Sequence, residues 1–486
     1  MALMDVFTHF SIVRRERRGI RPEEIKNLGI LKQAEFSLGD LTIICGRNNT
    51  GKTYATYALF GFLDTWRRLL TKPRFGLKEK IEQLLSDGVI SLDLQEYVQQ
   101  CEIILTTGCQ RYIQQIPEVF AANEERFKNV DFQIELNFDN IQFKKKYERK
   151  ISTATLEIIS INKPEDEPYL SITLLTETEK INLPVHFLEE IIYDSIQDII
   201  FSQFFPRPFI ASAERTGAAI FRKELNFARN RLLEEISKNS NFNPRELLFN
   251  VSQDYALLVK KNVDFTRQIE TIVKKTSFID ENHPSILEDF ADIIGGQYMI
   301  TNNDELYYIP KVKRQGKRLR LSMDESSSAV RSLLDIGFYL RHEARIGDLL
   351  IVDEPELNLH PENQRRIAKL FARLINIGIK VFITTHSDYI IKEINTLIML
   401  NQEKPHLKQI AAEEGYRQEE LLSADQVKVY IAEEDSKILK GQKRKTKFHT
   451  LNPAKIDPEM GIEARSFDTT IENMNRIQTA IIWGEE

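Results

Sequence analysis

The residues from Gly46 to Thr53 carry the sharpest chemical pattern in the sequence, Gly-Arg-Asn-Asn-Thr-Gly-Lys-Thr. An apolar run precedes this loop and a helix-forming run follows it, which is the context in which such a loop wraps phosphate. Its backbone N–H groups can face phosphate oxygens, and the start of the next helix adds a favourable dipole. We expect Lys52 to contact the β- and γ-phosphates and the Thr53 hydroxyl to ligate Mg²⁺. The candidate nucleotide-binding residues are Gly46, Arg47, Asn48, Asn49, Thr50, Gly51, Lys52 and Thr53.

A pair of acids, Asp353 and Glu354, follows the apolar run Leu-Leu-Ile-Val at 349–352. Such a run predicts a buried strand, and two acids at its end are typical of a Walker B segment. We expect Asp353 to hold the magnesium ion, directly or through water. Glu354 would orient and deprotonate the attacking water as a general base. Taken alone, the pattern would also fit the alternative of a strand that ends in an acidic turn.

A histidine, His386, ends a third apolar run after Thr384 and Thr385. It stands about 30 residues beyond the acid pair, with a predicted helix between the two runs. In a parallel sheet, such a histidine would lie beside the other two loops at the carboxyl ends of the strands. We expect it to contact the γ-phosphate, although a lone histidine is more often structural.

The elements that must position these residues are strands and helices of an α/β domain. Residues 29–45 predict two strands, and a helix is expected from Thr53 to about Leu70. The stretch from about 330 to 400 alternates helix and strand, which indicates a parallel sheet covered by helices. Residues 214–277 are charged and helical in pattern, which suggests a helical hairpin. Lys52 and Asp353 are about 300 residues apart, so a large insertion must split the domain.

The composition is that of a globular protein rather than of a membrane or secreted protein. The 486 residues are 42% hydrophobic and 28% charged, which is ordinary for a globular protein. No stretch approaches the roughly 18 apolar residues of a membrane span, and the amino terminus lacks a signal-peptide pattern. The three cysteines form no CxxC pair, so we expect neither disulfides nor zinc and place the protein in the cytoplasm. Basic runs at 14–21, 144–150, 311–320 and 440–447 leave a nucleic-acid surface open, against a net charge of −6.

These segments together resemble the RecF/SMC/OLD branch of the ABC-type ATPases, over about residues 29–70 and 290–400. The resemblance rests on the phosphate loop, on DEPELNLHP at 353–361, on ITTHSD at 383–388 and on PFIASAER at 208–215. It implies an α/β fold: an ABC-type P-loop ATPase head with a mostly parallel sheet, split by a helical, short coiled-coil insertion. The loop 356–361 would then be the D-loop, which lies along the partner subunit.

A signature segment that closes over the ATP of the opposite subunit is also expected from the resemblance. Its best match is residues 324–333, where the family usually reads Ser-Ser-Gly and this chain has Ser327, Ser328 and Ala329. Alanine leaves less room than glycine for backbone approach, so we expect slow hydrolysis. The alternative interpretation of this segment is a serine-rich helix cap.

The resemblance further implies that two heads sandwich two molecules of ATP with Mg²⁺, as a homodimer or a higher even oligomer. Each site would take its catalytic Glu354 and His386 from one chain and its Ser327 from the other. We divide the chain into a first head lobe (1–213), a helical hairpin insertion (214–290), a second head lobe (291–400) and a C-terminal region (401–486) open to partner docking.

The function that this ATPase cycle serves is predicted by analogy. OLD-type nucleases add a TOPRIM domain after the head, but the residues after Asn401 contain no Asp-x-Asp pair, and Glu433-Glu434-Asp435 is only a faint echo of one. The chain resembles the stand-alone PtuA-like, AriA-like and retron-associated ATPases of anti-phage operons. We therefore expect it to control a separately encoded effector, a nuclease or another toxin. The alternatives are a RecF-like repair ATPase that clamps nucleic acid and a scaffold that hydrolyses little ATP.

Overall fold

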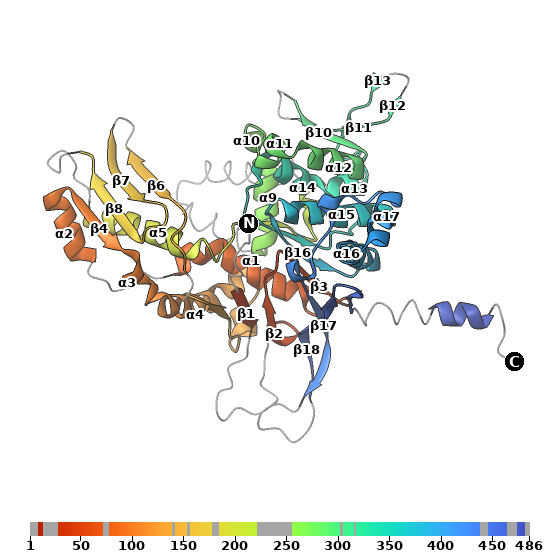
Figure 1. The fold of residues 1–486 in the computed structure, drawn as a ribbon, viewed down its shortest axis with the longest axis horizontal. Coiled ribbons are helices and arrows are strands. Elements are labelled where there is room, and N and C mark those ends of the chain that lie inside the picture. The colour runs from red at the N-terminus through yellow and green to blue at the C-terminus, as the bar shows by residue number, and fades with distance from the viewer. Residues whose placement is uncertain are drawn as a thin grey trace, which may run out of the picture. The chain divides into compact units, whose positions relative to one another are not determined.

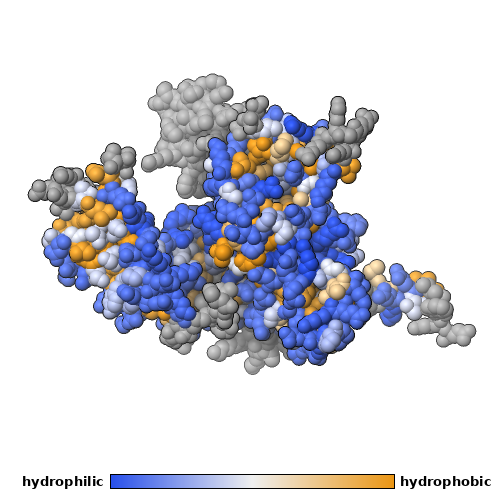
Figure 2. Space-filling model, turned by 45° about the horizontal axis from the view of Figure 1, so that its top comes forward, coloured by the Kyte–Doolittle hydropathy of each residue, from blue (hydrophilic) through white to orange (hydrophobic). Residues whose placement is uncertain are grey.

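The computed structural model describes residues 8–12, 28–70, 77–138, 141–152, 156–176, 184–220, 255–301, 305–314, 317–437, 446–463 and 474–481. The chain divides into two compact units, each described by itself. The first comprises Met1–Ser11, Phe62–Gln114 and Asp131–Pro206, and the second comprises Ile12–Gly61, Gln115–Val130 and Arg207–Glu486. Hydrophilic side chains dominate the face of the molecule in Figure 2, and hydrophobic residues gather in separate patches.

The second unit is built on a sheet whose strands run in the order β2-β18-β17-β3-β16-β15-β9. These strands are β2 (Leu31–Ser37), β3 (Leu41–Cys45), β9 (Pro208–Ala211), β15 (Leu349–Asp353), β16 (Lys380–Thr385), β17 (Val427–Lys437) and β18 (Thr446–Pro453). All neighbours in this order pair in parallel except β17 and β18, which are antiparallel. The predicted α/β class with a mostly parallel sheet is therefore confirmed.

The second unit also contains helices, and the longer ones have polar and apolar faces that follow the 3.6-residue repeat. They are α1 (Lys52–Leu69), α6 (Arg215–Ile220), α9 (Leu257–Arg267), α10 (Ile269–Ile272), α11 (Phe278–Asn282), α12 (Pro284–Ile294), α13 (Ser328–Ser332), α14 (Leu334–Phe338), α15 (Pro361–Asn376), α16 (Asp388–Leu400) and α17 (Pro405–Glu413). A π-helical turn, η4 (Tyr339–Glu343), continues α14. Helix α15 begins with proline, which suits a first helical turn because its missing N–H has no partner there.

The remaining elements of the second unit are short. Three strands form a small antiparallel sheet: β10 (Gly296–Ile300), β11 (Leu306–Pro310) and β14 (Leu321–Ser322). Two strand pairs are β12 (Lys313–Arg314) with β13 (Lys317–Arg318), and β19 (Ile456–Asp457) with β20 (Gly461–Ile462). Single turns of 3₁₀ helix are η2 (Glu124–Phe127), η5 (Gln418–Glu420) and η6 (Ala424–Gln426).

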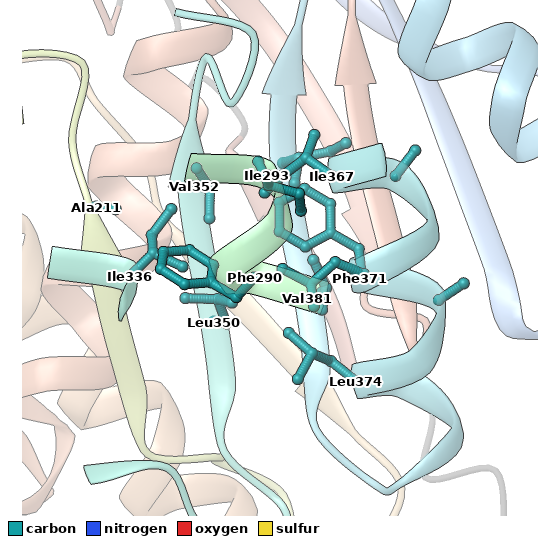
Figure 3. Close-up of a cluster of buried hydrophobic side chains, with 14 of the residues drawn as sticks. Ala211, Phe290, Ile293, Ile336, Leu350, Val352, Ile367, Phe371, Leu374 and Val381 are labelled. Carbon is teal, nitrogen blue, oxygen red and sulfur yellow. The ribbon is translucent and has the colours of Figure 1, made fainter. Parts of the chain in front are cut away.

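The core of the second unit lies between the central strands and the helices α12 and α15. Every residue of β3 and of β15 is buried. Figure 3 shows side chains of α12 and α15 gathered around strand residues, among them Phe290, Phe371, Leu350 and Val381. Burial of each such side chain stabilises the fold by about 1.5–3 kcal/mol relative to exposure. The continuous apolar runs of the sequence therefore correspond to strands covered on both faces.

The C-terminal region contributes strands to this sheet, which the sequence analysis did not predict. Strand β17 pairs in parallel with β3, and β18 pairs in parallel with β2. In Figure 1 these blue strands lie beside the red strands of the amino-terminal part. Glu433 and Glu434, the faint TOPRIM echo, lie in β17 and bind Asn452 and Lys447 of β18. They are surface residues of a β-ribbon.

The first unit contains an antiparallel sheet in the order β4-β8-β7-β6. Its strands are β4 (Val89–Asp93), β6 (Tyr147–Ser152), β7 (Glu157–Lys163) and β8 (Tyr169–Leu174). Strand β1 (Thr8–Ile12) pairs with β5 (Gln133–Leu136) in the antiparallel direction. Its helices are α2 (Leu77–Asp87), α3 (Leu94–Val98), most of α4 (Cys101–Phe120) and α5 (Val185–Phe201). Aromatic rings fill its core, with Phe62 against Tyr112, Phe132 and Phe205.

The predicted helical hairpin is described only in part, because residues 221–254 lie outside the described residues. The part from Leu257 to Ile294 forms the helices α9 to α12. Ile269, Ile279 and Ile286 on these helices belong to the core cluster of the sheet domain. The predicted domain limits of 1–213, 214–290, 291–400 and 401–486 stay predictions.

Candidate functional site

The three chemical segments predicted from the sequence follow neighbouring strands. Strands β3, β16 and β15 are adjacent and parallel, with Cys45 opposite Thr385 and Asp353 opposite Thr384. The phosphate loop, the acid pair and His386 therefore all leave the sheet at the same carboxyl edge. This edge is where parallel α/β sheets bind ligands.

The conformation of the phosphate loop depends on two glycines and on the Lys52 side chain. Gly46 and Gly51 have φ angles of 144° and 100°, which residues with a side chain rarely adopt. A Cβ atom on Gly46 would lie 2.4 Å from the carbonyl oxygen of Ala432 in β17. The Lys52 ammonium donates to the carbonyl oxygens of Gly46 and Arg47 at 3.0 and 2.8 Å. The C-terminal strand β17 thus forms one wall behind the loop.

Lys52 and Thr53 differ in exposure although they are adjacent. Burial lowers the pKa of the Lys52 ammonium, and the nearby carboxylates of Glu354 and Asp353 oppose that shift. Thr53 is exposed at the start of α1, as are three residues of the loop before it, Arg47, Asn48 and Asn49. A buried cation beside exposed hydroxyl and amide groups suits a loop that receives phosphate from solvent.

Asp353 is a buried carboxylate, with 2% of its surface exposed. Burial raises the pKa of its carboxyl group to about 6, and a hydrogen bond donated by the Thr384 hydroxyl opposes this shift. The exposed Glu214, which accepts a 3.4 Å hydrogen bond from the Tyr57 hydroxyl, also contributes to the raised pKa of Asp353. Oxygen donors of this kind are the ligands that Mg²⁺ prefers.

Glu354 has a left-handed backbone conformation, with a φ angle of 52°. Its N–H donates to both the carbonyl and the hydroxyl oxygen of Thr384, at 3.1 and 3.2 Å. A non-glycine residue in this region costs about 1–3 kcal/mol, and such strain gathers at functional sites. Its side chain is 28% exposed, so the carboxylate can reach solvent while the backbone is fixed.

His386 is anchored by Glu356, a residue that the sequence analysis assigned only to the D-loop. One carboxylate oxygen of Glu356, Oε1, accepts hydrogen bonds from the Thr385 hydroxyl at 2.9 Å and from the His386 N–H at 2.8 Å. The imidazole Nδ1 lies 3.1 Å from Glu356 Oε1 and 3.7 Å from Glu354 Oε1. The buried Glu356 therefore fixes the histidine loop against the acid loop. Its position three residues after Asp353 was visible in the sequence, but its burial was not.

Arg215 is the charged residue that ties the site together, and only 1% of it is exposed. Its guanidinium donates to four backbone carbonyl oxygens: Ser332 at 2.6 Å, Ser212 at 2.7 Å, Asp353 at 2.6 Å and Glu354 at 2.8 Å. Desolvation lowers its pKa, and the Asp353 carboxylate opposes that shift. The arginine of the Ala-Glu-Arg element thus joins the acid loop directly to the end of α13.

A second buried charge stands beside this arginine. Asp335 on α14 accepts a hydrogen bond from the Thr266 hydroxyl at 3.3 Å. Burial raises the pKa of its carboxyl group to about 7, and the positive charge of Arg215 acts in the opposite direction. Helix α13, which carries the predicted signature segment, and the following helix α14 are therefore packed around a buried cation and a buried acid.

The signature serines make their hydrogen bonds within their own segment. Ser327 caps α13 by accepting from the Val330 N–H at 3.3 Å, and Ser328 accepts from the Arg331 guanidinium at 3.3 Å. Both serines are exposed, whereas Ala329 packs against the core. The helix-cap interpretation describes this geometry correctly, and a role toward a second chain stays a prediction.

The basic segments of the sequence are partly outside the described residues, which exclude 14–21 and 440–445. Lys146 pairs with Glu148 at 2.7 Å, and Lys150 pairs with Glu157 at 3.0 Å. Lys311 pairs with Asp292. These exposed basic residues therefore have acidic partners, which reduces the positive field that they could offer to nucleic acid.

The fold and the site together define a P-loop nucleotide-binding protein. A family model described as an AAA ATPase domain matches residues 20–391, which is more than half of the chain. The chain therefore belongs to this family of ATPases. No curated protein matches the sequence. Within the part of the chain that the structure describes, no helix is long and apolar enough to cross a membrane.

Solved structures of SMC heads are similar to this chain at low scores. The SMC head domain from Thermotoga maritima has a TM-score of 0.29 and 9% identity, with 93% of this chain and all of that chain covered. An SMC head bound to the C-terminal winged-helix domain of ScpA has a TM-score of 0.30 and 12% identity, covering 91% of this chain and 98% of that one. A third, derived from Pyrococcus furiosus, scores 0.29 at 12% identity and covers 97% and 99%. Likeness at these scores carries no functional information.

Replacement of Arg215 by methionine should destabilise the second unit, because four carbonyl oxygens lose a charged donor. We expect a loss of about 3 kcal/mol, seen as a lower midpoint of thermal unfolding together with loss of ATP turnover. The matched control is Arg345→Met, since Arg345 is exposed and should change stability by less than about 0.5 kcal/mol. Equal unfolding midpoints for Arg215→Met and the wild type would contradict the clamping role.

Binding of Mg²⁺ with ATP should weaken in acid because Asp353 has a raised pKa of about 6. Below that pH the neutral acid is favoured, and a metal ligand must be ionised. We expect the Mg²⁺-dependent gain in ATP affinity to fall by about tenfold for each pH unit below 6. A fluorescent ATP analogue titrated with Mg²⁺ or with EDTA from pH 5 to 8 measures this gain. The same pH profile in Asp353→Asn would show that another group is responsible.

Proposed function

We propose that this ATPase dimerises around ATP in the cytoplasm and controls a separately encoded effector, a nuclease or another toxin, in bacterial anti-phage defence. The proposal of a dimer rests on one observation, which is that the site of a single chain is open to solvent. Residues that position the site, such as Arg215 and Glu356, are buried, whereas Thr53, His386 and Ser327 are exposed. A chemical site that must exclude water needs a second surface to close over it.

The residues present fit Mg²⁺ with ATP. Phosphate would lie against the backbone and the lysine of the phosphate loop, and the donor set for the metal is the Thr53 hydroxyl with the Asp353 carboxylate. The metal would supply charge neutralisation between the phosphates. Glu354, fixed at its backbone and free at its carboxylate, would take the proton of the attacking water. His386, held by Glu356, would donate a hydrogen bond to the γ-phosphate.

Closure would come from the signature segment of the second chain. Ser327 and Ser328 are exposed at the start of α13, so they are accessible to a partner. Arg215 connects that same helix to the acid loop through the carbonyl oxygens of Ser332 and Asp353. Contact between α13 and the partner's nucleotide would therefore change the position of Asp353 and Glu354 in the chain's own site. This connection would let ATP occupancy act on an effector.

The effector would bind exposed surfaces of residues 401–486 that do not pack on the sheet. Helix α17 has no buried residue, and Ile410 on it is 43% exposed. Met460, just before β20, is 79% exposed. Exposed apolar side chains contribute to a protein interface where they form a contiguous patch. They support the proposed docking role of residues 401–486.

The test uses Glu354→Gln, which should bind ATP while hydrolysis slows by about 10²–10⁴-fold. The tagged variant is expressed in the native host with its neighbouring genes intact and purified with ATP. We expect a protein from a neighbouring gene to co-purify in fixed stoichiometry, as identified by mass spectrometry. The matched control is Lys52→Ala, which should retain less of that protein if nucleotide governs the complex. Recovery of only DNA or RNA that salt removes would favour the nucleic-acid clamp instead.

A further inference from the structure

A cavity of about 640 Å³ lies in the second unit, apart from the phosphate loop. Its walls are the strand β10, the helices α12 and α14, the π-helical turn η4 and the segment from Glu270 to Lys274. Pockets for small molecules usually measure about 300–1,000 Å³ and combine apolar walls with a few polar groups. The size and the mixed lining both fall in this class.

Aromatic rings form one wall of the cavity. Phe338 stacks on Tyr298 with centroids 5.7 Å apart at an angle of 28°, and it stacks on His342 at 5.8 Å and 25°. Phe290 adds a further ring, 6.5 Å from Tyr298. Ordered rings offer faces and edges against which another planar group packs favourably.

Basic groups stand beside these rings. Arg341 and Lys274 line the cavity with a single carboxylate, Glu270, so the charged lining is positive by one. The imidazole Nδ1 of His342 lies 2.8 Å from the carbonyl oxygen of Lys275, and burial lowers the pKa of this histidine. The Nδ1 N–H therefore donates to that carbonyl oxygen. The charged lining suits a ligand that carries one negative charge.

The backbone beside the cavity has two unusual features, a π-helical turn and a closely packed glycine. Residues 339–343 form a π-helical turn, closed by the Ala344 N–H donating to the Tyr339 carbonyl oxygen at 2.9 Å. Such turns are rare and occur often at functional sites, where they redirect side chains. Gly337 lies so close to the rings that an added Cβ would be 2.7 Å from Phe290 and 2.8 Å from Tyr298. The turn carries both Arg341 and His342.

We propose that this cavity binds a small planar aromatic anion, which packs on the half-buried ring of Tyr298 and pairs with Arg341 and Lys274. The Tyr298 hydroxyl donates to the carbonyl oxygen of Val330 on the signature helix. The ligand would therefore act on the position of that helix. Only this effect on the signature helix rests on the proposed function, because binding itself does not require ATP.

The test uses the dye anilinonaphthalene sulfonate, an aromatic monoanion whose fluorescence rises on binding. With the full-length chain and no nucleotide, we expect saturable binding of one dye per chain. Arg341→Gln should weaken it by about tenfold, because a charged hydrogen-bond partner is lost. Ala291→Phe places a ring in the cavity and should abolish binding.

Matched controls separate the cavity from other apolar surfaces. Arg345 and Ala412 are exposed and do not line the cavity, so Arg345→Gln and Ala412→Phe should bind the dye as the wild type does. Unchanged dye affinity in both Arg341→Gln and Ala291→Phe would overturn the proposal, as would equal losses in the controls. If Ala291→Phe fails to fold, Arg341→Gln against Arg345→Gln decides. ATP binding by the dye-deficient variants would show that the nucleotide site is intact.

Discussion

The buried guanidinium of Arg215 is the interaction on which the site depends. It is surrounded by carbonyl oxygens of three separate segments: the end of β9, the acid loop after β15 and the end of α13. A buried charge is tolerated only when its donors are satisfied, so these segments must be in place together. Arg215 therefore holds helix α13, the predicted signature helix, in a fixed position relative to the acid loop, although about 20 residues separate them in the sequence.

The reactive groups beside Arg215 have fixed backbones, and their side chains stay partly exposed to solvent. Glu354 is fixed by a strained φ angle and by Thr384, and His386 is fixed by the carboxylate of Glu356. Such fixed geometry lowers the reorganisation that chemistry would need once a nucleotide and a second surface are present. The carboxyl groups of Asp353 and Asp335 have raised pKa values because burial in the protein interior desolvates them.

The sequence predicted the parts of this arrangement that are local. The phosphate loop, the apolar strands before it and before Asp353, and the helix α1 each follow from residues close in the chain. The insertion of β17 beside β3 could not be predicted in this way, because a strand's partner depends on the whole sheet. Arg215 and Glu356 were also missed as positioning groups. Charged residues are usually exposed, and nothing in their local sequence shows that these two are buried.

In the proposed dimer the signature segment of one chain closes on the phosphate loop of another, and this contact can be measured by cross-linking. Two differently tagged Glu354→Gln chains are co-expressed, one with Asn48→Cys and the other with Ser327→Cys. The native cysteines are buried, so a short bifunctional maleimide should act on the new thiols. We expect a covalent dimer of the two chains that requires Mg²⁺ and ATP and disappears with Lys52→Ala. Chains that bind ATP but give no ATP-dependent cross-link would contradict the account.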